Sequence, residues 1–193
     1  MRIGIVGRFK PPHIGSSAVL KLLSERADIF QIAIGSSNKY DERNPFTITE
    51  TMKMIEIVLE GKRGYHVHLV PDYGDGNLWA MDVADTLGEL DYFVSGNDYV
   101  IDLLKDKYYK ILHTSAISGL PKYDIRSTEI RISMARGDGR WQYLVIPSIR
   151  DYIMMNHLDE RFVDEFGKKT LEIASTNLWK DQSAEAERGH TKI

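Results

Sequence analysis

The sequence contains no cysteine, no long hydrophobic run and no excess of positive charge. Without cysteine there can be no disulfide, no thiolate zinc site and no thiol nucleophile. No apolar run approaches the roughly 20 residues needed to span a bilayer. Lys and Arg number 25 against 28 Asp and Glu, and a net charge of −3 argues against a broad basic face for nucleic acid. We therefore expect a chain that binds neither membranes nor nucleic acids.

The remaining bulk properties are those of an ordinary globular chain. It has 193 residues, of which 42% are hydrophobic and 27% charged, enough for one well-buried core. The N-terminus starts with strand-like sequence rather than with a signal peptide, so we expect a cytoplasmic location.

Short apolar runs of strand-forming residues alternate with helix-period segments in the first two thirds of the chain. The expected strands cover residues 3–6, 29–34, 66–70, 92–94 and 111–112, and the expected helices 17–26, 47–59, 78–87 and 99–105. This alternation predicts an α/β fold with a Rossmann-like, doubly wound parallel sheet. Active sites in such sheets lie at the carboxyl ends of the strands, where the strand order reverses. We expect the loops after the first, second and fourth strands to meet there.

The last third of the sequence predicts C-terminal helices. Ser127 is an N-cap candidate for a helix that closes at Gly137, Pro147 opens the next, and a further helix is expected over residues 160–174. From residue 177 the chain is polar and is expected to fray. We expect one domain over residues 1–160, followed by a C-terminal helix and polar tail over residues 161–193.

The turn from Gly7 to Ser16 is the segment with the most chemistry. It joins the first strand to the first helix, where unpaired backbone N–H groups and the helix dipole favour an anion. Arg8, Lys10 and His13 add charge or hydrogen-bond donors at the same place. His13 can be read as a donor to a phosphate oxygen or as a solvent-exposed loop histidine.

Other candidates lie at helix starts and also allow two readings. Thr128 and Arg131 are three residues apart, so they can face one polyphosphate, or they can be a cap and an exposed arginine. Arg43 precedes a helix whose Thr47 and Glu50 predict a capping box, and it is either a site residue or a solvated loop charge. Trp79 can stack on a planar heterocycle or pack in the core.

Two further groups of polar residues are interpreted as structural. His66 and His68 share one face of a strand, but nothing near them in the sequence completes a metal site. Asp72, Asp75 and Asp82 are expected in a solvated loop rather than around a metal.

Taken in order, these segments resemble the nucleotidylyltransferase superfamily, whose signature is a turn of type HxGH and a later helix start of type (S/T)xx(R/K). The chain is most similar to the archaeal type of nicotinamide mononucleotide adenylyltransferase. The resemblance covers residues 1–160 and depends on several short segments: Gly7-Arg8-Phe9, His13-Ile14-Gly15, Ile34-Gly35-Ser36, Arg43-Asn44-Pro45-Phe46-Thr47, Asn77-Leu78-Trp79, Ser95-Gly96-Asn97 and Ser127-Thr128-Glu129-Ile130-Arg131.

The resemblance implies transfer of AMP from ATP to nicotinamide mononucleotide, which forms NAD and pyrophosphate. Magnesium would arrive with the ATP, the partners would be small nucleotides, and the chain would form a homo-oligomer. His13 would contact the α-phosphate, and Thr128 and Arg131 the β- and γ-phosphates. The remaining nucleotide-binding positions would be Gly7, Arg8, Phe9, Gly15, Arg43, Trp79, Gly96, Asn97, Arg126 and Ser127, with Gly96 and Asn97 by the adenosine and Trp79 on the nicotinamide.

The sequence departs from the superfamily signature at two places. Ser16 stands where the second histidine of the HxGH turn is expected, and Arg126 where a serine is usual at the later helix start. A serine cannot supply positive charge to the reacting phosphorus, and we hypothesise that the guanidinium of Arg126 compensates. Two alternatives stay open: a related enzyme with a phosphopantetheine, flavin nucleotide or phosphoalcohol acceptor, and a nucleotide-binding protein with little catalysis.

Overall fold

A computed structural model describes residues 1–107, 110–121, 123 and 125–176. Its centre is a five-stranded, entirely parallel sheet in the order β3-β2-β1-β4-β5. The strands are β1 (Arg2–Gly7), β2 (Ile29–Gly35), β3 (Tyr65–Val70), β4 (Tyr92–Ser95) and β5 (Ile111–His113). The predicted doubly wound α/β sheet is therefore confirmed, with strand ends within a residue or two of those expected.

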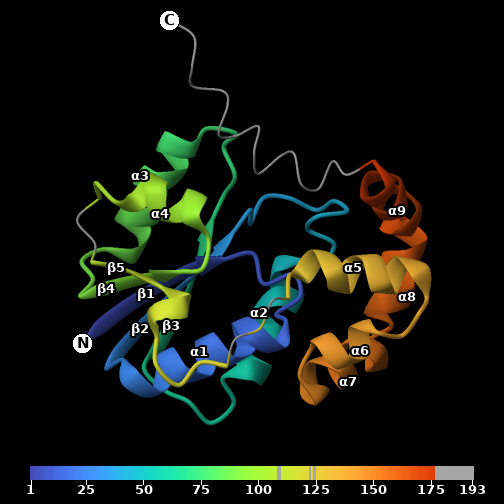
Figure 1. The fold of residues 1–193 in the computed structure, drawn as a ribbon, viewed down its shortest axis with the longest axis horizontal. Helices are drawn as coiled ribbons and strands as arrows, with labels where there is room; N and C mark the ends of the chain where they lie inside the picture. Colours follow the sequence, from blue (N-terminus) through green and yellow to red (C-terminus); the bar gives the residue numbers. More distant parts are fainter. Residues whose placement is uncertain (108–109, 122, 124, 177–193) are drawn as a thin grey trace, which may run out of the picture.

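Helices cover both faces of the sheet (Figure 1). On one face lie α1 (Ile14–Arg26) and α2 (Ile48–Val58), and on the other α3 (Gly76–Leu87) and α4 (Asp98–Leu104). Successive strand residues point to opposite faces. Accordingly Ile32 and Ile34 pack against the first pair of helices, while Ala33 between them packs against the second. Burial on both faces explains why the strands are almost continuously apolar.

The strand order places three polar loops at one edge of the sheet. In the parallel register Gly7 of β1 lies beside Ile34 of β2, and Ile5 lies beside Val94 of β4. The chain leaves β1 toward β2 and later returns to its other side with β4, so the order reverses at β1. The loops after β1, β2 and β4 consequently surround the reversal point, as expected for a binding crevice.

The C-terminal helices gather at the carboxyl end of the sheet (Figure 1). They are α5 (Ser127–Arg136), α6 (Trp141–Leu144), α7 (Pro147–Met155), α8 (Leu158–Phe162) and α9 (Lys168–Ser175), with a 3₁₀ turn η1 (Thr114–Ala116) before them. A π-helical turn, η2 (Val163–Gly167), joins α8 to α9. The helix predicted over residues 160–174 is thus present, with that turn inside it.

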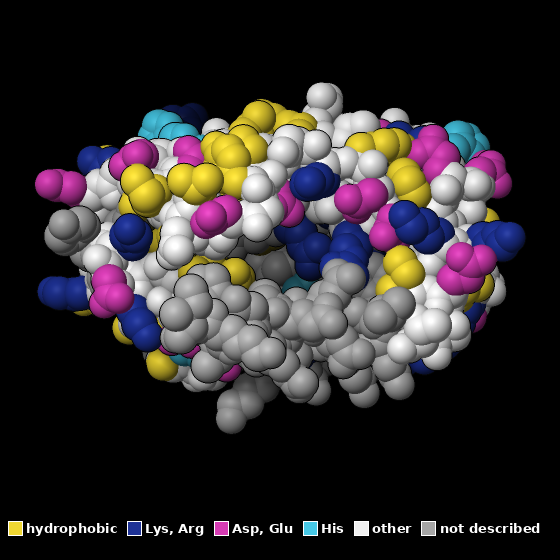
Figure 2. All heavy atoms as spheres, turned by 90° about the horizontal axis from the view of Figure 1, so that it is seen from above, with side chains coloured by type: hydrophobic (Ala, Val, Ile, Leu, Met, Phe, Trp, Pro, Cys, Tyr) yellow, Lys and Arg dark blue, Asp and Glu magenta, His cyan; other side chains and the backbone are white. Residues whose placement is uncertain are grey.

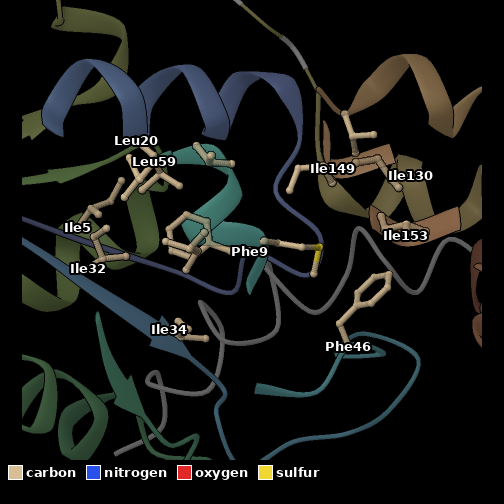
Figure 3. Close-up of a cluster of buried hydrophobic side chains, with 14 of the residues drawn as sticks. Ile5, Phe9, Leu20, Ile32, Ile34, Phe46, Leu59, Ile130, Ile149 and Ile153 are labelled. Carbon is tan, nitrogen blue, oxygen red and sulfur yellow. The ribbon is translucent and has the colours of Figure 1, made fainter. Parts of the chain in front are cut away.

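One hydrophobic cluster connects the sheet to these helices (Figure 3). Phe9 and Phe46, from the loops after β1 and β2, lie between strand residues such as Ile5 and helix residues such as Ile149. Phe46 and Ile149 are both fully buried. The loops that carry the candidate site are therefore packed into the core on their inner side.

Local differences from the expectations occur mainly at helix starts. Helix α3 begins at Gly76 rather than at Leu78, because the side chain of Asp75 accepts hydrogen bonds from two backbone N–H groups of its first turn. The polar tail from residue 177 lies outside the described residues. Within the part of the chain that is described, none of the helices combines the length and apolar composition that crossing a membrane requires.

Ile32 lies at the centre of the sheet with no exposed surface. We expect Ile32→Ala to lower the free energy of unfolding by about 2–5 kcal/mol, because it removes buried methyl groups and leaves a cavity. Urea unfolding followed by circular dichroism measures this change. Leu69→Ala is the control, since Leu69 on the edge strand is 46% exposed. An equal loss in both variants would contradict the assigned core.

Candidate active site

The turn after β1 is shaped by a close approach between Gly7 and Phe9. Phe9 has a φ of 52°, in the left-handed region that bulky residues rarely adopt. Its ring lies against Gly7, where an added Cβ would come within 2.7 Å of the ring carbon Cζ. Gly7 is therefore required by the Phe9 ring, which is itself 7% exposed and part of the core. Both residues shape the turn from its inner side.

His13 is the N-cap of α1 and is held in one tautomer. Its Nδ1 accepts a hydrogen bond from the backbone N–H of Ser16 at 3.2 Å. Because Nδ1 is an acceptor, the ring hydrogen of the neutral imidazole lies on Nε2. Burial lowers the pKa of His13 to about 4, so the ring is neutral at pH 7. A Cβ on Gly15 would lie 3.0 Å from Nδ1, so Gly15 gives the ring its room.

Ser16 uses its hydroxyl within the turn. Its Oγ donates to the carbonyl oxygen of His13 at 2.9 Å. The hydrogen of the hydroxyl is therefore engaged by the backbone, which leaves an oxygen that can only accept. Ser16 does not offer the site a donor in this conformation.

The start of α5 is tied to the same turn. Ser127 Oγ donates to the carbonyl oxygen of Pro11 at 2.9 Å, and Arg131 Nη1 donates to the carbonyl oxygen of Lys10 at 3.2 Å. Arg131 Nη2 also donates to Thr128 Oγ1 at 3.1 Å. The predicted i, i+3 pair is thus in contact, and Arg131 is 1% exposed rather than a surface arginine.

The expectation that Ser127 caps α5 is wrong. The N-cap is Arg126, and Ser127 is the first helical residue, with its hydroxyl used on the turn instead. The carboxylate of Glu129 accepts from the backbone N–H of Arg126 at 3.1 Å, which satisfies the helix start without a serine cap. The Arg126 side chain is exposed.

A hollow of about 410 Å³ opens beside the turn. A space-filling view shows Lys and Arg side chains gathered inside a depression near the middle of one face, with a His side chain at depth (Figure 2). Two of the four site arginines predicted from the sequence, Arg8 and Arg43, line the hollow. Its other lining residues come from the loop after β2, from Asp72, and from α9: Ser36, Lys39, Asp41, Glu42, Asn44, Asp72 and Ile173.

Three arginines of the site are near enough to repel one another. Burial, followed by the charges of Arg8 and Arg43, lowers the pKa of Arg131 to about 9. Burial and Arg43 also lower the pKa of Arg8. Arg8 is nevertheless accessible to solvent, because it lies at an open concave surface. A group of mutually repelling guanidinium groups in a concave site is suited to a polyanion.

Hydrogen bonds within the loop that carries Arg43, and at the start of α2, hold this loop in place. Burial would raise the pKa of Asp41, but hydrogen bonds from the Asn44 side chain and the backbone N–H groups of Arg43 and Asn44 outweigh it, and the pKa is lowered. The predicted capping box between Thr47 and Glu50 is present. These contacts fix the loop where it enters α2.

Sequence reasoning missed the contribution of the C-terminal helices to this loop. Arg161 of α8 forms a two-pronged pair with Glu50, at 2.5 Å and 2.7 Å, and donates to the carbonyl oxygen of Pro45 at 3.1 Å. Lys169 of α9 pairs with Glu42 at 2.9 Å. The partners are 111 and 127 positions apart in the chain, so no local pattern could have revealed them. The expected boundary at residues 160/161 stays a prediction.

The remaining predicted residues lie at the same sheet edge but outside the hollow. Asn97 caps α4 through a hydrogen bond from the N–H of Tyr99 at 3.0 Å. A Cβ on Gly96 would lie 2.7 Å from Thr114 Oγ1, so a larger residue would be displaced. Trp79 in α3 packs against the second core cluster and is only partly buried.

Of the histidines and acids interpreted as structural, His68 and Asp72 have hydrogen-bond partners in the fold. The expectation of a loop for all three acids is wrong, because Asp75 is the N-cap of α3 and Asp82 lies within that helix. His68 Nε2 lies 2.7 Å from Gln31 Oε1, and Asp72 accepts from the N–H of Gly74 at 3.0 Å. Across the described residues, no three His, Asp or Glu side chains form a group that could hold a metal ion.

Comparison with known proteins identifies the class. The cytidylyltransferase-like family model matches residues 5–133, so the chain belongs to this family. Among curated proteins, the nicotinamide-nucleotide adenylyltransferase of Thermococcus sibiricus is 34% identical over 159 residues, covering 79% of this chain and 83% of that protein. The nicotinamide-nucleotide adenylyltransferase of Aeropyrum pernix is 30% identical over 165 residues, covering 83% and 94%.

Solved structures share the fold at low identity. A bifunctional NMN adenylyltransferase/ADP ribose pyrophosphatase from Francisella tularensis, complexed with AMP and manganese, matches with a TM-score of 0.63 and 18% identity, over 93% of this chain. This chain spans about half, 56%, of that longer protein. The nicotinic acid mononucleotide adenylyltransferase of Plasmodium falciparum matches with a TM-score of 0.56 and 14% identity, covering 82% of this chain and 97% of that one.

The low pKa of His13 makes a prediction for stability. The pKa is about 4 in the folded state against 6.5 for an ordinary histidine, so the unfolded state binds the proton first as the pH falls. The stabilising contribution is complete above pH 6.5 and is lost toward pH 4. Between pH 7.5 and pH 5.0 the free energy of unfolding should fall by up to about 2 kcal/mol more in the native protein than in His13→Asn. The asparagine keeps an acceptor for the helix cap but does not titrate.

Urea unfolding of both proteins at the two pH values measures this difference. Titration of other groups is common to both proteins and cancels in the comparison. If the two free energies of unfolding differed by the same amount at both pH values, the buried, neutral state assigned to His13 would be contradicted.

Proposed function

We propose that the protein is a nicotinamide-nucleotide adenylyltransferase, which transfers AMP from ATP to nicotinamide mononucleotide and releases pyrophosphate. The observation that carries this proposal is the grouping of Arg8, Arg43 and Arg131 beside a neutral His13 at the reversal point of the sheet. The names of the curated relatives support the same activity. A homo-oligomeric state and a cytoplasmic location stay predictions.

In the proposed reaction an oxygen of the acceptor's 5′-phosphate attacks the α-phosphorus of ATP. The new P–O bond forms in line with the bond between the α-phosphorus and the oxygen that bridges to the β-phosphate. That bond breaks, and its electron pair leaves with pyrophosphate. Such a transfer needs positioning and charge neutralisation rather than a covalent intermediate. Magnesium would arrive with the ATP and would neutralise part of the charge of its phosphates.

The roles proposed for the residues follow from their donors. The Nε2–H of His13 donates to an α-phosphate oxygen, and because the ring is neutral it orients the phosphate without an ion pair. Thr128 contacts the β- and γ-phosphates from the start of α5, and Arg131, which is 1% exposed, adds its charge from behind through its hydrogen bond to Thr128 Oγ1. Arg8 and Arg43 hold phosphate oxygens across the hollow.

The acceptor is chosen on the other side of the sheet edge. Trp79 at the start of α3 is only partly buried, and a flat aromatic can stack on the nicotinamide. Gly96 and Asn97 follow β4 and would lie by the adenosine. Trp79, with Asn77 and Leu78, is therefore the feature that favours a pyridine nucleotide over phosphopantetheine, flavin nucleotide or phosphoalcohol acceptors.

Pyrophosphate release over a panel of acceptors tests the proposed function. With MgATP present, nicotinamide mononucleotide should give the highest kcat/KM, and NAD should appear in equal amount. Trp79→Ala should raise the KM for nicotinamide mononucleotide about tenfold, since stacking on one ring contributes roughly 1–3 kcal/mol. No preference for this acceptor would contradict the proposal.

A second candidate, a nucleotide-binding protein with little turnover, is favoured by the hydrogen bond of Ser16. Its hydroxyl donates to the carbonyl oxygen of His13, so in this arrangement Ser16 does not supply the donor that the second histidine of the superfamily turn would. Loss of one preorganised donor costs about 10²–10³ in rate in other enzymes. Arg126 directly precedes Ser127, whose hydroxyl donates to the carbonyl oxygen of Pro11 in the turn. The exposed guanidinium of Arg126 is therefore the proposed replacement for the missing donor.

Two variants decide between compensation and loss. If Arg126 supplies the missing charge, Arg126→Ala should lower kcat about tenfold or more, and Ser16→His should raise it little. Both kcat values are measured by continuous pyrophosphate release. Intact turnover in Arg126→Ala together with a large gain in Ser16→His would contradict compensation. Tight ATP binding by calorimetry without turnover in any of them would establish the second candidate.

A further inference from the structure

Lys10 is a buried lysine inside the phosphate-binding turn. It is 1% exposed, although lysine is almost never fully buried without a partner. The side chain therefore does not face the hollow, and it does not line it, unlike Arg8 two residues earlier. A buried ammonium must be compensated by hydrogen bonds, and those bonds identify what it holds.

The ammonium binds the loop after β2. Nζ donates to the carbonyl oxygen of Ser36 at 3.1 Å and to that of Lys39 at 3.4 Å. Ser36 has a φ of 52°, a left-handed conformation that costs energy for a residue other than glycine. The Ser36 carbonyl also accepts the N–H of Lys39 at 3.1 Å, which closes a turn. Lys10 thus binds the two carbonyls that define this turn.

The backbone of Lys10 contacts a third segment. Its carbonyl oxygen accepts from Arg131 Nη1 at 3.2 Å. The same residue therefore connects the turn after β1, the loop after β2 and helix α5. Beyond the bound carbonyls, the loop continues into Asp41 and Arg43, which line the hollow together with Arg8.

We propose that Lys10 is a positioning residue whose buried ammonium fixes the loop of residues 36–44 against the turn, so that Arg43 faces the hollow opposite Arg8. This inference rests on the proposed function of the hollow as a nucleotide phosphate site. Lys10 acts through Arg43 and touches no substrate. A direct contact with phosphate and a purely structural role are the two outcomes that would replace it.

The charges around Lys10 give it a pH dependence that can be measured. Burial and the charge of Arg8 lower the pKa of Lys10 to about 8, although the nearby carboxylate of Asp41 acts to raise it. The other charged group in contact is Arg131, which donates to the carbonyl oxygen of Lys10. Since the pKa is below the ordinary 10.5, the unfolded state holds the proton more strongly above pH 8. The contribution of Lys10 to stability therefore increases between pH 8 and pH 10.5. Nucleotide affinity should decrease over the same range, because a neutral amine holds the carbonyls less well.

Calorimetric binding of MgATP at pH 7 and pH 9 tests the proposal on the full chain. Lys10→Met has nearly the same length but no donor. We expect it to weaken MgATP binding about tenfold at pH 7, as for the loss of a charge-assisted hydrogen bond. Between pH 7 and pH 9 its binding should weaken less than that of the native protein, and the weakening that remains comes from Arg131, whose pKa is about 9. Lys62→Met is the matched control, since Lys62 pairs with Glu25 away from the hollow.

A double-variant cycle with Arg43→Gln shows whether Lys10 acts through Arg43. If it does, the double variant should bind MgATP no more weakly than Arg43→Gln alone. Fully additive effects, or native-like binding by Lys10→Met, would overturn the proposal. If Lys10→Met does not fold, Lys10→Arg, which keeps its charge at pH 9, decides the matter: the native protein should lose more MgATP affinity than Lys10→Arg between pH 7 and pH 9, and equal losses overturn the proposal. Because the readout is binding, failure to form NAD would count against the proposed function and not against Lys10.

Discussion

The pairing of β1 with β2 on one side and β4 on the other is the constraint on which the candidate site depends. This parallel pairing brings three loops that are far apart in the sequence to one edge, at the point where the strand order reverses. The loop after β1 contributes Arg8 and His13, and the loop after β2 contributes Arg43. Helix α5 is held at the same turn by the hydrogen bond from Ser127 to Pro11. The cationic groups needed for a polyphosphate therefore come from separate segments, which strand pairing and this hydrogen bond bring together.

The second feature of the site is that its cations are held by backbone carbonyls as much as by acids. Arg131 and Lys10 are each 1% exposed, and the hydrogen bonds described for them include the carbonyl oxygens of the turn and of the loop after β2. A carbonyl group carries no net charge, so these hydrogen bonds hold the two cations in place without adding negative charge to the site. The C-terminal helices complete it from outside, through Arg161 and through Ile173 in the wall of the hollow.

The sequence predicts the sheet well and the site only in part. Continuous apolar strands and capped helices depend on local patterns, which is why the five strands and the Thr47 box agree with the structure. The use of Ser127 on Pro11 instead of as a cap, and the pairing of Arg161 with Glu50, depend on contacts more than 100 residues apart. The burial of Lys10 depends on carbonyl partners 26 and 29 residues away in the chain, whereas the local sequence predicts its charge at the ligand.

A crystal structure of the protein with NAD tests the central claim, that the hollow and the turn form one nucleotide site. The account predicts the pyrophosphate of NAD within hydrogen-bond distance of His13 Nε2 and between Arg8 and Arg43, with the nicotinamide stacked on Trp79. It also predicts that the Lys10 ammonium still binds the carbonyls of Ser36 and Lys39. NAD bound away from the turn, or a pyrophosphate that does not touch His13, would contradict the account.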